Sequence, residues 1–121
     1  MSRKLNVLLT CIGGYGALTL LEDFERSEIA KEINFIGTHS DPIFLGRSPL
    51  KTNYLVPSAL KEPEKYLQAT KKIIEMENAD LIIPKSDAEV KALYPVLDKI
   101  KCDTFLPDFA EIDATQDKLD F

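Results

Sequence analysis

Histidine and cysteine are scarce in this sequence, and their scarcity excludes several kinds of chemistry. The 121 residues contain one histidine, His39, and two cysteines, Cys11 and Cys102, with no tryptophan. Two distant cysteines are too few for a disulfide scaffold, and a structural zinc site needs more ligands at closer spacing. A catalytic site with a second imidazole is excluded as well. Cys11 follows an apolar run, which is more typical of a buried strand-end cysteine than of a nucleophile.

Basic residues are fewer than acidic ones, and the sequence has no long apolar run. The chain has 15 basic and 20 acidic residues, a formal net charge of −5 and a pI near 4.9. It therefore lacks the basic stripe with which proteins bind nucleic acid or acidic lipid surfaces. The apolar runs are of strand length, and residues 1–9 enter a strand without the pattern of a signal peptide. We expect a cytoplasmic protein with neither nucleic acid nor a membrane as its partner.

The rest of the composition indicates one folded domain. Hydrophobic residues make up 45% of the chain and charged residues 29%, which is an ordinary balance for a globular protein. A single core is usual at about 100 to 150 residues. We therefore expect one packed core.

Short apolar runs alternate with amphipathic stretches along the chain. Strands are expected at 5–10, 33–37, 54–58, 80–84 and 103–108. Three helices are expected: one from Ala17, one that residues 62–64 open and whose apolar period runs to Glu77, and one from Ser86 or Asp87 to Ile100. A loop is expected over 38–53 and a helical turn over 108–113. This order predicts an open, mostly parallel sheet of about five strands with helices on both faces, a Rossmann-like α/β fold. We predict the strand order 3-2-1-4-5.

A glycine turn, residues 13–16, follows the first strand. Ligands of open α/β sheets bind beyond the carboxyl ends of the strands, and glycines let an anion approach the backbone there. Gly14, Gly16 and Thr19 match the dinucleotide fingerprint GxGxxG only partly, as GxGxxT. Asp41 stands where an acid would bind a ribose, but an Asp before proline is also an ordinary turn former. The turn therefore fits an anion, a dinucleotide, or plain packing of strand against helix.

Several segments together resemble one enzyme family. They are "NVLLTCIGGYGALTLLEDF", "INFIGTHSDP", "YLVPS", "ADLIIPKSDAEV", "TFLPD" and "DKLDF". In order and spacing they resemble the N-terminal region of ATP-grasp ligases of the carbamoyl phosphate synthase large-chain type, over nearly the whole chain. The resemblance implies a Rossmann-like pre-ATP-grasp domain over 1–115 and the start of an ATP-grasp domain at 116–121. It further implies an enzyme that uses ATP and Mg²⁺ to activate a carboxylate as an acyl phosphate, which an amine or similar nucleophile then attacks.

The resemblance also implies which residues form the site. Gly13, Gly14, Tyr15 and Gly16 would border the substrate cleft together with Asp41, and Ser86, Asp87 and Glu89 would face it from the end of the fourth strand. Lys118 would reach toward the nucleotide phosphate. The last four residues also have ordinary explanations, since Ser, Asp and Glu make a good helix start and an exposed lysine is commonplace. His39 is placed to contact a ligand, yet a lone loop histidine is more often exposed or hydrogen-bonded.

The acids for Mg²⁺ and the lysines that hold ATP in this family would lie beyond Phe121. We therefore expect the chain alone to be inactive and to bind a small carboxylate or amine, with its missing ATP-grasp domain as partner. The alternatives are a self-contained Rossmann-type nucleotide- or ligand-binding module and a pure interaction domain. The sequence leaves the identity of the substrate and the formation of a homodimer open.

Overall fold

The structure, a computed structural model, describes residues 4–100 and 103–104. Its elements follow one another as β1 (Leu5–Leu9), α1 (Tyr15–Glu25), the 3₁₀ helix η1 (Glu28–Glu32), β2 (Ile33–His39), α2 (Pro42–Leu45), β3 (Thr52–Leu55), α3 (Pro63–Glu77), β4 (Leu81–Ile83), α4 (Asp87–Leu93), the 3₁₀ helix η2 (Tyr94–Lys99) and β5 (Asp103–Thr104). Strands and helices alternate as the sequence predicts.

The strands form one parallel sheet with the order β3-β2-β1-β4-β5. Both the Rossmann-like α/β class and the strand order predicted from the sequence are confirmed. The central strand β1 pairs with β2 and β4, so that Leu8 lies beside Ile36 on one side and Ile82 on the other. All three side chains are at most 1% exposed, as expected for the middle of a parallel sheet covered on both faces.

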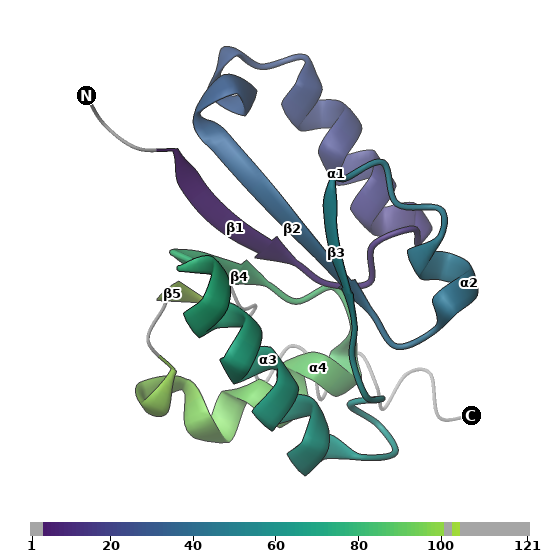
Figure 1. Ribbon diagram of the computed structural model, residues 1–121, viewed down its shortest axis with the longest axis vertical. Helices are drawn as coiled ribbons and strands as arrows, with labels where there is room; N and C mark the ends of the chain where they lie inside the picture. The colour runs from purple at the N-terminus through teal and green to yellow at the C-terminus, as the bar shows by residue number, and fades with distance from the viewer. Residues whose placement is uncertain (1–3, 101–102, 105–121) are drawn as a thin grey trace.

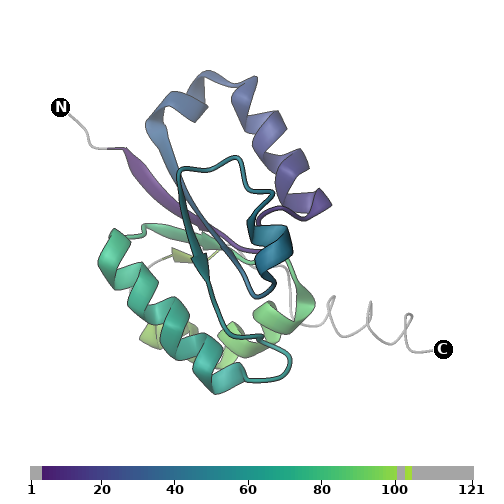
Figure 2. The ribbon, with the colours of Figure 1, turned by 45° about the vertical axis from the view of Figure 1, so that its right-hand side comes forward.

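Helices cover both faces of the sheet. Figures 1 and 2 show α1 on one side and α3 with α4 on the other. Successive residues of β1 point to opposite faces, so Leu8 and Leu9 belong to different clusters of buried side chains. The cluster beneath α3 and α4 contains Leu8, Ile36, Val56, Tyr66, Ile73, Ile74, Ala79, Ile82 and Leu93. The cluster beneath α1 contains Leu9, Ile12, Ala17 and Leu21.

The helix boundaries follow local chemistry. Ser86 caps α4, because its hydroxyl accepts a hydrogen bond from the Glu89 N–H at 3.2 Å. Pro63 stands in the first turn of α3, where its missing N–H costs nothing. Asn78 ends α3 in the left-handed conformation, with φ of 51° and ψ of 48°. The helix expected from Ala17 begins two residues earlier, at Tyr15.

Two expectations about the path of the chain are wrong. The stretch 38–53 is not all loop, since β2 continues to His39, α2 occupies Pro42–Leu45 and β3 begins at Thr52 rather than at 54. Asp41 starts α2, because its carboxylate accepts a hydrogen bond from the Ile43 N–H and Pro42 occupies the first turn. The helix expected to run to Ile100 ends at Leu93 and continues as η2, with a non-helical Val96. Pro95 explains the break, since it lacks the N–H that an α-helix needs there.

Some expectations fall outside the described residues: most of the strand at 103–108, the turn at 108–113 and the second domain at 116–121. Of the helices within 4–100, none combines the length and the apolar character needed to cross a lipid bilayer.

Candidate functional site

The carboxyl ends of four strands lead to one cavity of about 170 Å³. We call it the Glu89 cavity. Its wall comes from the segments after β1 and β3, from the end of β2, and from α3 and α4. The lining residues are Cys11, His39, Ser40, Val56, Pro57, Ser58, Ala59, Leu60, Tyr66, Ser86, Ala88 and Glu89. This is the edge at which open α/β sheets bind ligands.

Glu89 is the central polar residue of this cavity, and its side chain is only 6% exposed. Its Oε1 accepts hydrogen bonds from the Cys11 thiol and the Ser86 hydroxyl, both at 2.9 Å. Its Oε2 accepts one from the Tyr66 hydroxyl at 2.6 Å. Three donors from three separate elements thus hold one buried carboxylate in place. The ordinary explanation of Ser86 and Glu89 as a helix start is correct, but it covers only part of what these side chains do.

The two acidic donors beside Glu89 both keep their protons at neutral pH. Burial raises the pKa of the Cys11 thiol to about 12, and the charge of Glu89 and its hydrogen bond add to this effect. Burial and the same carboxylate raise the pKa of Tyr66 above its ordinary range. A protonated thiol is a poor nucleophile. Cys11 therefore serves as a hydrogen-bond donor in the wall of the cavity.

His39 lies in the cavity wall at the end of β2. Its Nδ1 accepts a hydrogen bond from the Asp41 N–H at 2.8 Å, so the proton of the neutral ring is on Nε2. The ring stacks on Phe44, with centroids 5.0 Å apart and planes inclined by 12°. Arg47 lies over the same Phe44 ring, at 5.2 Å from its centroid. His39, the last residue of β2, is thus fixed in orientation beside the cavity.

The glycine turn packs tightly against α2. Gly13 has a φ of +88°, and a Cβ at this position would stand 1.8 Å from the Phe44 carbonyl oxygen. The Gly14 N–H donates to the Cys11 carbonyl and closes the turn. Figures 1 and 2 show α2 beside the start of α1. Close packing is therefore sufficient to explain Gly13. The glycines do not line the Glu89 cavity, whereas Cys11 just before them does.

The start of α1 has different chemistry. Gly14 is its N-cap residue and offers no side chain to the first N–H groups, and the first turn contains no acidic residue. Gly16 lies close to the Lys85 side chain, since a Cβ there would be 3.5 Å from Lys85 Cε. The backbone N–H of Lys85 donates a hydrogen bond to the Thr10 hydroxyl at 2.7 Å. The N-terminus of α1 and the Lys85 ammonium are thus two positive groups at this edge of the sheet, and the Asp87 carboxylate lines the same cavity as Lys85.

The remaining expected site residues are dispersed. Tyr15 is 88% exposed on α1. Asp41 caps α2, as its alternative explanation predicts, and does not line the Glu89 cavity. Asp87 lies beside a different cavity of about 540 Å³ between α1 and α4. Lys118 lies outside the described residues.

Sequence reasoning missed Tyr66 as a site residue. The apolar period of α3 places it on the inner face of this helix, where it is 1% exposed. A tyrosine on an apolar face is a usable signal, because a buried hydroxyl needs a hydrogen-bond partner. The partner, Glu89, is 23 residues away and on another helix.

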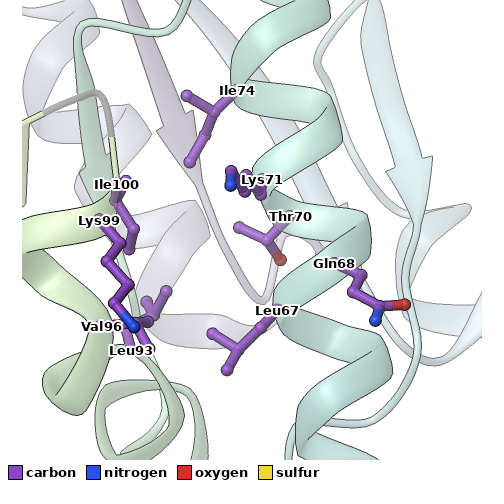
Figure 3. A pocket seen from close by; sticks show the side chains of 9 residues that line it. All are labelled: Leu67, Gln68, Thr70, Lys71, Ile74, Leu93, Val96, Lys99 and Ile100. Carbon is purple, nitrogen blue, oxygen red and sulfur yellow. The ribbon is translucent and has the colours of Figure 1, made fainter.

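A third cavity, of about 160 Å³, lies between the helices rather than at the strand ends. Figure 3 shows Leu67, Thr70 and Ile74 of α3 facing Leu93, Val96 and Ile100 across it. This wall is mainly apolar and has no carboxylate. The Glu89 cavity is therefore the better candidate for a site with polar chemistry.

The fold and this cavity define the class: an α/β domain with a Rossmann-like open parallel sheet and a polar cavity at the carboxyl edge. No protein-family model matches the sequence, and no curated protein is significantly similar to it.

Proposed function

We propose that this chain is the substrate-side domain of an ATP-dependent ligase, which activates a carboxylate as an acyl phosphate for attack by an amine or similar nucleophile. The observation that supports it is the Glu89 cavity, at the edge where parallel α/β sheets bind small molecules. The resemblance to pre-ATP-grasp domains in the order of the motifs leads to the same class.

The electrostatics of this edge suit such a reaction. The first turn of α1 and Lys85 favour a negatively charged group, such as a carboxylate or an acyl phosphate. The Glu89 carboxylate favours a donor or a cation. In this class of reaction the protein acts mainly by positioning the reactants and neutralising charge. Positively and negatively charged side chains at one edge of the sheet could position the reactants and neutralise their charges.

ATP and Mg²⁺ would bind mainly to residues beyond Phe121, with Lys118 as the expected contact to a phosphate. When bound, ATP would supply the phosphoryl group that activates the carboxylate, and Mg²⁺ would neutralise charge on the phosphates. The residues described here would bind and orient the substrates. We therefore expect the purified 121 residues to form no ADP from ATP and Mg²⁺.

The first test concerns the encoding reading frame and the activity of its full product. We expect an extension past Phe121 with a glycine-rich loop and paired acids, and amine-dependent ADP formation by the full protein. Mg²⁺-dependent ADP formation by the 121 residues alone would refute the proposed division of labour.

A second test distinguishes the alternative, a self-contained dinucleotide-binding module. Calorimetry of the chain with NAD, NADP and ATP should show no micromolar binding of a dinucleotide. In the dinucleotide fingerprint the third glycine permits close packing of helix and strand. Here Thr19 takes that place and is exposed, with its hydroxyl donating to the Tyr15 carbonyl at 2.9 Å. Micromolar binding of NAD or NADP would favour the module and overturn the ligase proposal.

A further inference from the structure

We infer that the Glu89 cavity binds the amine partner of the reaction, as a primary ammonium group hydrogen-bonded to Glu89 Oε2. This inference rests on the proposed function and names the class of one substrate. It starts from the charge of the cavity wall. Among the lining residues Glu89 is the only carboxylate, and there is no lysine or arginine. An ionised Glu89 therefore leaves the wall negative.

The other titratable groups of the wall do not offset this charge. Cys11 and Tyr66 keep their protons and donate hydrogen bonds to Glu89. The Nδ1 atom of His39 accepts a hydrogen bond from the Asp41 N–H. A carboxylate buried without a cation is costly, because it loses its hydration without gaining an opposite charge. A bound ammonium group supplies that charge.

The hydrogen bonds of Glu89 show where the ligand would bind. The two oxygens of a carboxylate have about four acceptor positions, two on each oxygen. Cys11 and Ser86 occupy both positions of Oε1, whereas Tyr66 occupies one position of Oε2. One acceptor position on Oε2 is left for a donor from the cavity. A primary ammonium has three N–H donors, and the hydroxyls of Ser40 and Ser58, which belong to the same wall, each have acceptor capacity, although the Ser58 hydroxyl already accepts a bond from the Lys61 N–H at 3.2 Å.

The size of the cavity limits the ligand. Its volume of about 170 Å³ equals roughly five or six water molecules at about 30 Å³ each. That is sufficient for the end of an aminoalkyl chain and too small for a nucleoside. The negative charge of Glu89 would repel an anion, and a purely apolar group would leave the free acceptor position on Glu89 Oε2 without a hydrogen-bond donor. A small primary amine satisfies both the charge and the donor requirement.

The inference is tested by NMR titration of the full chain with four probes at constant ionic strength and pH 7.5. Ethylammonium and ethanolamine carry charge and N–H donors, acetate carries the opposite charge, and tetramethylammonium has charge without a donor. We expect binding of the first two, on the order of millimolar for ligands of three or four heavy atoms. The amide signals of Cys11, Tyr66 and Glu89 should shift. Acetate or tetramethylammonium should bind at least tenfold more weakly.

Two matched variants locate the effect. Glu89→Gln keeps the shape of the side chain and removes its charge, so it should weaken ethylammonium binding at least tenfold. Glu64→Gln removes an exposed carboxylate from α3, the helix that carries Tyr66, outside the Glu89 cavity, and should leave the affinity unchanged. Equal binding of acetate and ethylammonium, or an equal loss in both variants, overturns the inference. If Glu89→Gln does not fold, the comparison of the four probes on the unaltered chain still decides.

The amine inference and the ligase proposal fail in different ways. If the full protein forms ADP and Glu89→Gln leaves its KM for the amine unchanged, the amine site is wrong and the ligase stands. If ethylammonium binds at the Glu89 cavity but the full protein never forms ADP, the ligase is wrong and the amine site stands.

Discussion

Replacement of Gly13 by alanine should destabilise the protein strongly, although it adds only one methyl group. The left-handed φ of +88° costs an L-residue about 1–2 kcal/mol. In addition, the new Cβ would stand 1.8 Å from the Phe44 carbonyl oxygen, more than an ångström inside the 3.0 Å that real contacts keep. Because the obstacle is backbone, α2 must move, at a cost of about 1–3 kcal/mol. The sum is about 2–5 kcal/mol.

Thermal unfolding followed by circular dichroism measures this effect. For a domain of this size about 4 °C correspond to 1 kcal/mol, so the Tm should fall by roughly 8–20 °C. Gly16→Ala is the matched control. Its Cβ would meet only Lys85 Cε at an ordinary 3.5 Å, and alanine favours helix over glycine by up to about 1 kcal/mol. Its Tm should be equal to that of the original chain or higher. A Tm of Gly13→Ala within about 2 °C of that of Gly16→Ala would refute the packing of the turn against α2.

Three further outcomes are expected. Tyr66→Phe removes the donor to the buried Glu89 Oε2 and should lower the free energy of unfolding, measured in urea, by about 1–3 kcal/mol. The same change at the exposed Tyr15 should alter this free energy by no more than about 0.5 kcal/mol. Equal effects of the two variants would contradict the buried hydrogen bond. The pKa of the Cys11 thiol is raised from 9.0 to about 12. The stability that this shift contributes is complete below pH 9 and is lost between pH 9 and 12, because only the unfolded chain releases the thiol proton in that range. The free energy of unfolding of the original chain should therefore fall more steeply with pH in that range than that of Cys11→Ser. The extra loss should be about 1–2 kcal/mol in total, after allowance for solvent screening of this partly exposed group. Parallel pH profiles of the two proteins would contradict the pKa shift. At Asn78, with φ of 51°, alanine should cost about 1 kcal/mol and glycine should cost nothing, so a loss of stability in both variants would contradict the left-handed end of α3.

Local pattern was sufficient for the sheet and for most element starts. The strands β1, β2 and β4 are mainly apolar runs, and α1, α3 and α4 have apolar stripes at the helical period; these signals arise from neighbouring residues. The start of α4 follows from the Ser86 cap, and the start of α3 follows from the proline in its first turn. The break of the last helix was missed, although Pro95 was visible, because the apolar period runs through it to Ile100. α2 was missed because a four-residue helix has no period to detect.

The sequence by itself determined the alternation of strands and helices, the parallel sheet and the edge at which the candidate site lies. Only the tertiary structure decided which side chains meet there. Cys11 and Glu89 are 78 positions apart, and they touch because β1 and β4 are neighbours in the sheet. Gly13 is constrained by the backbone of Phe44 on a helix that no local pattern indicates. Period and capping depend on residues within one turn or two, whereas the partners of a buried carboxylate depend on how distant segments pack.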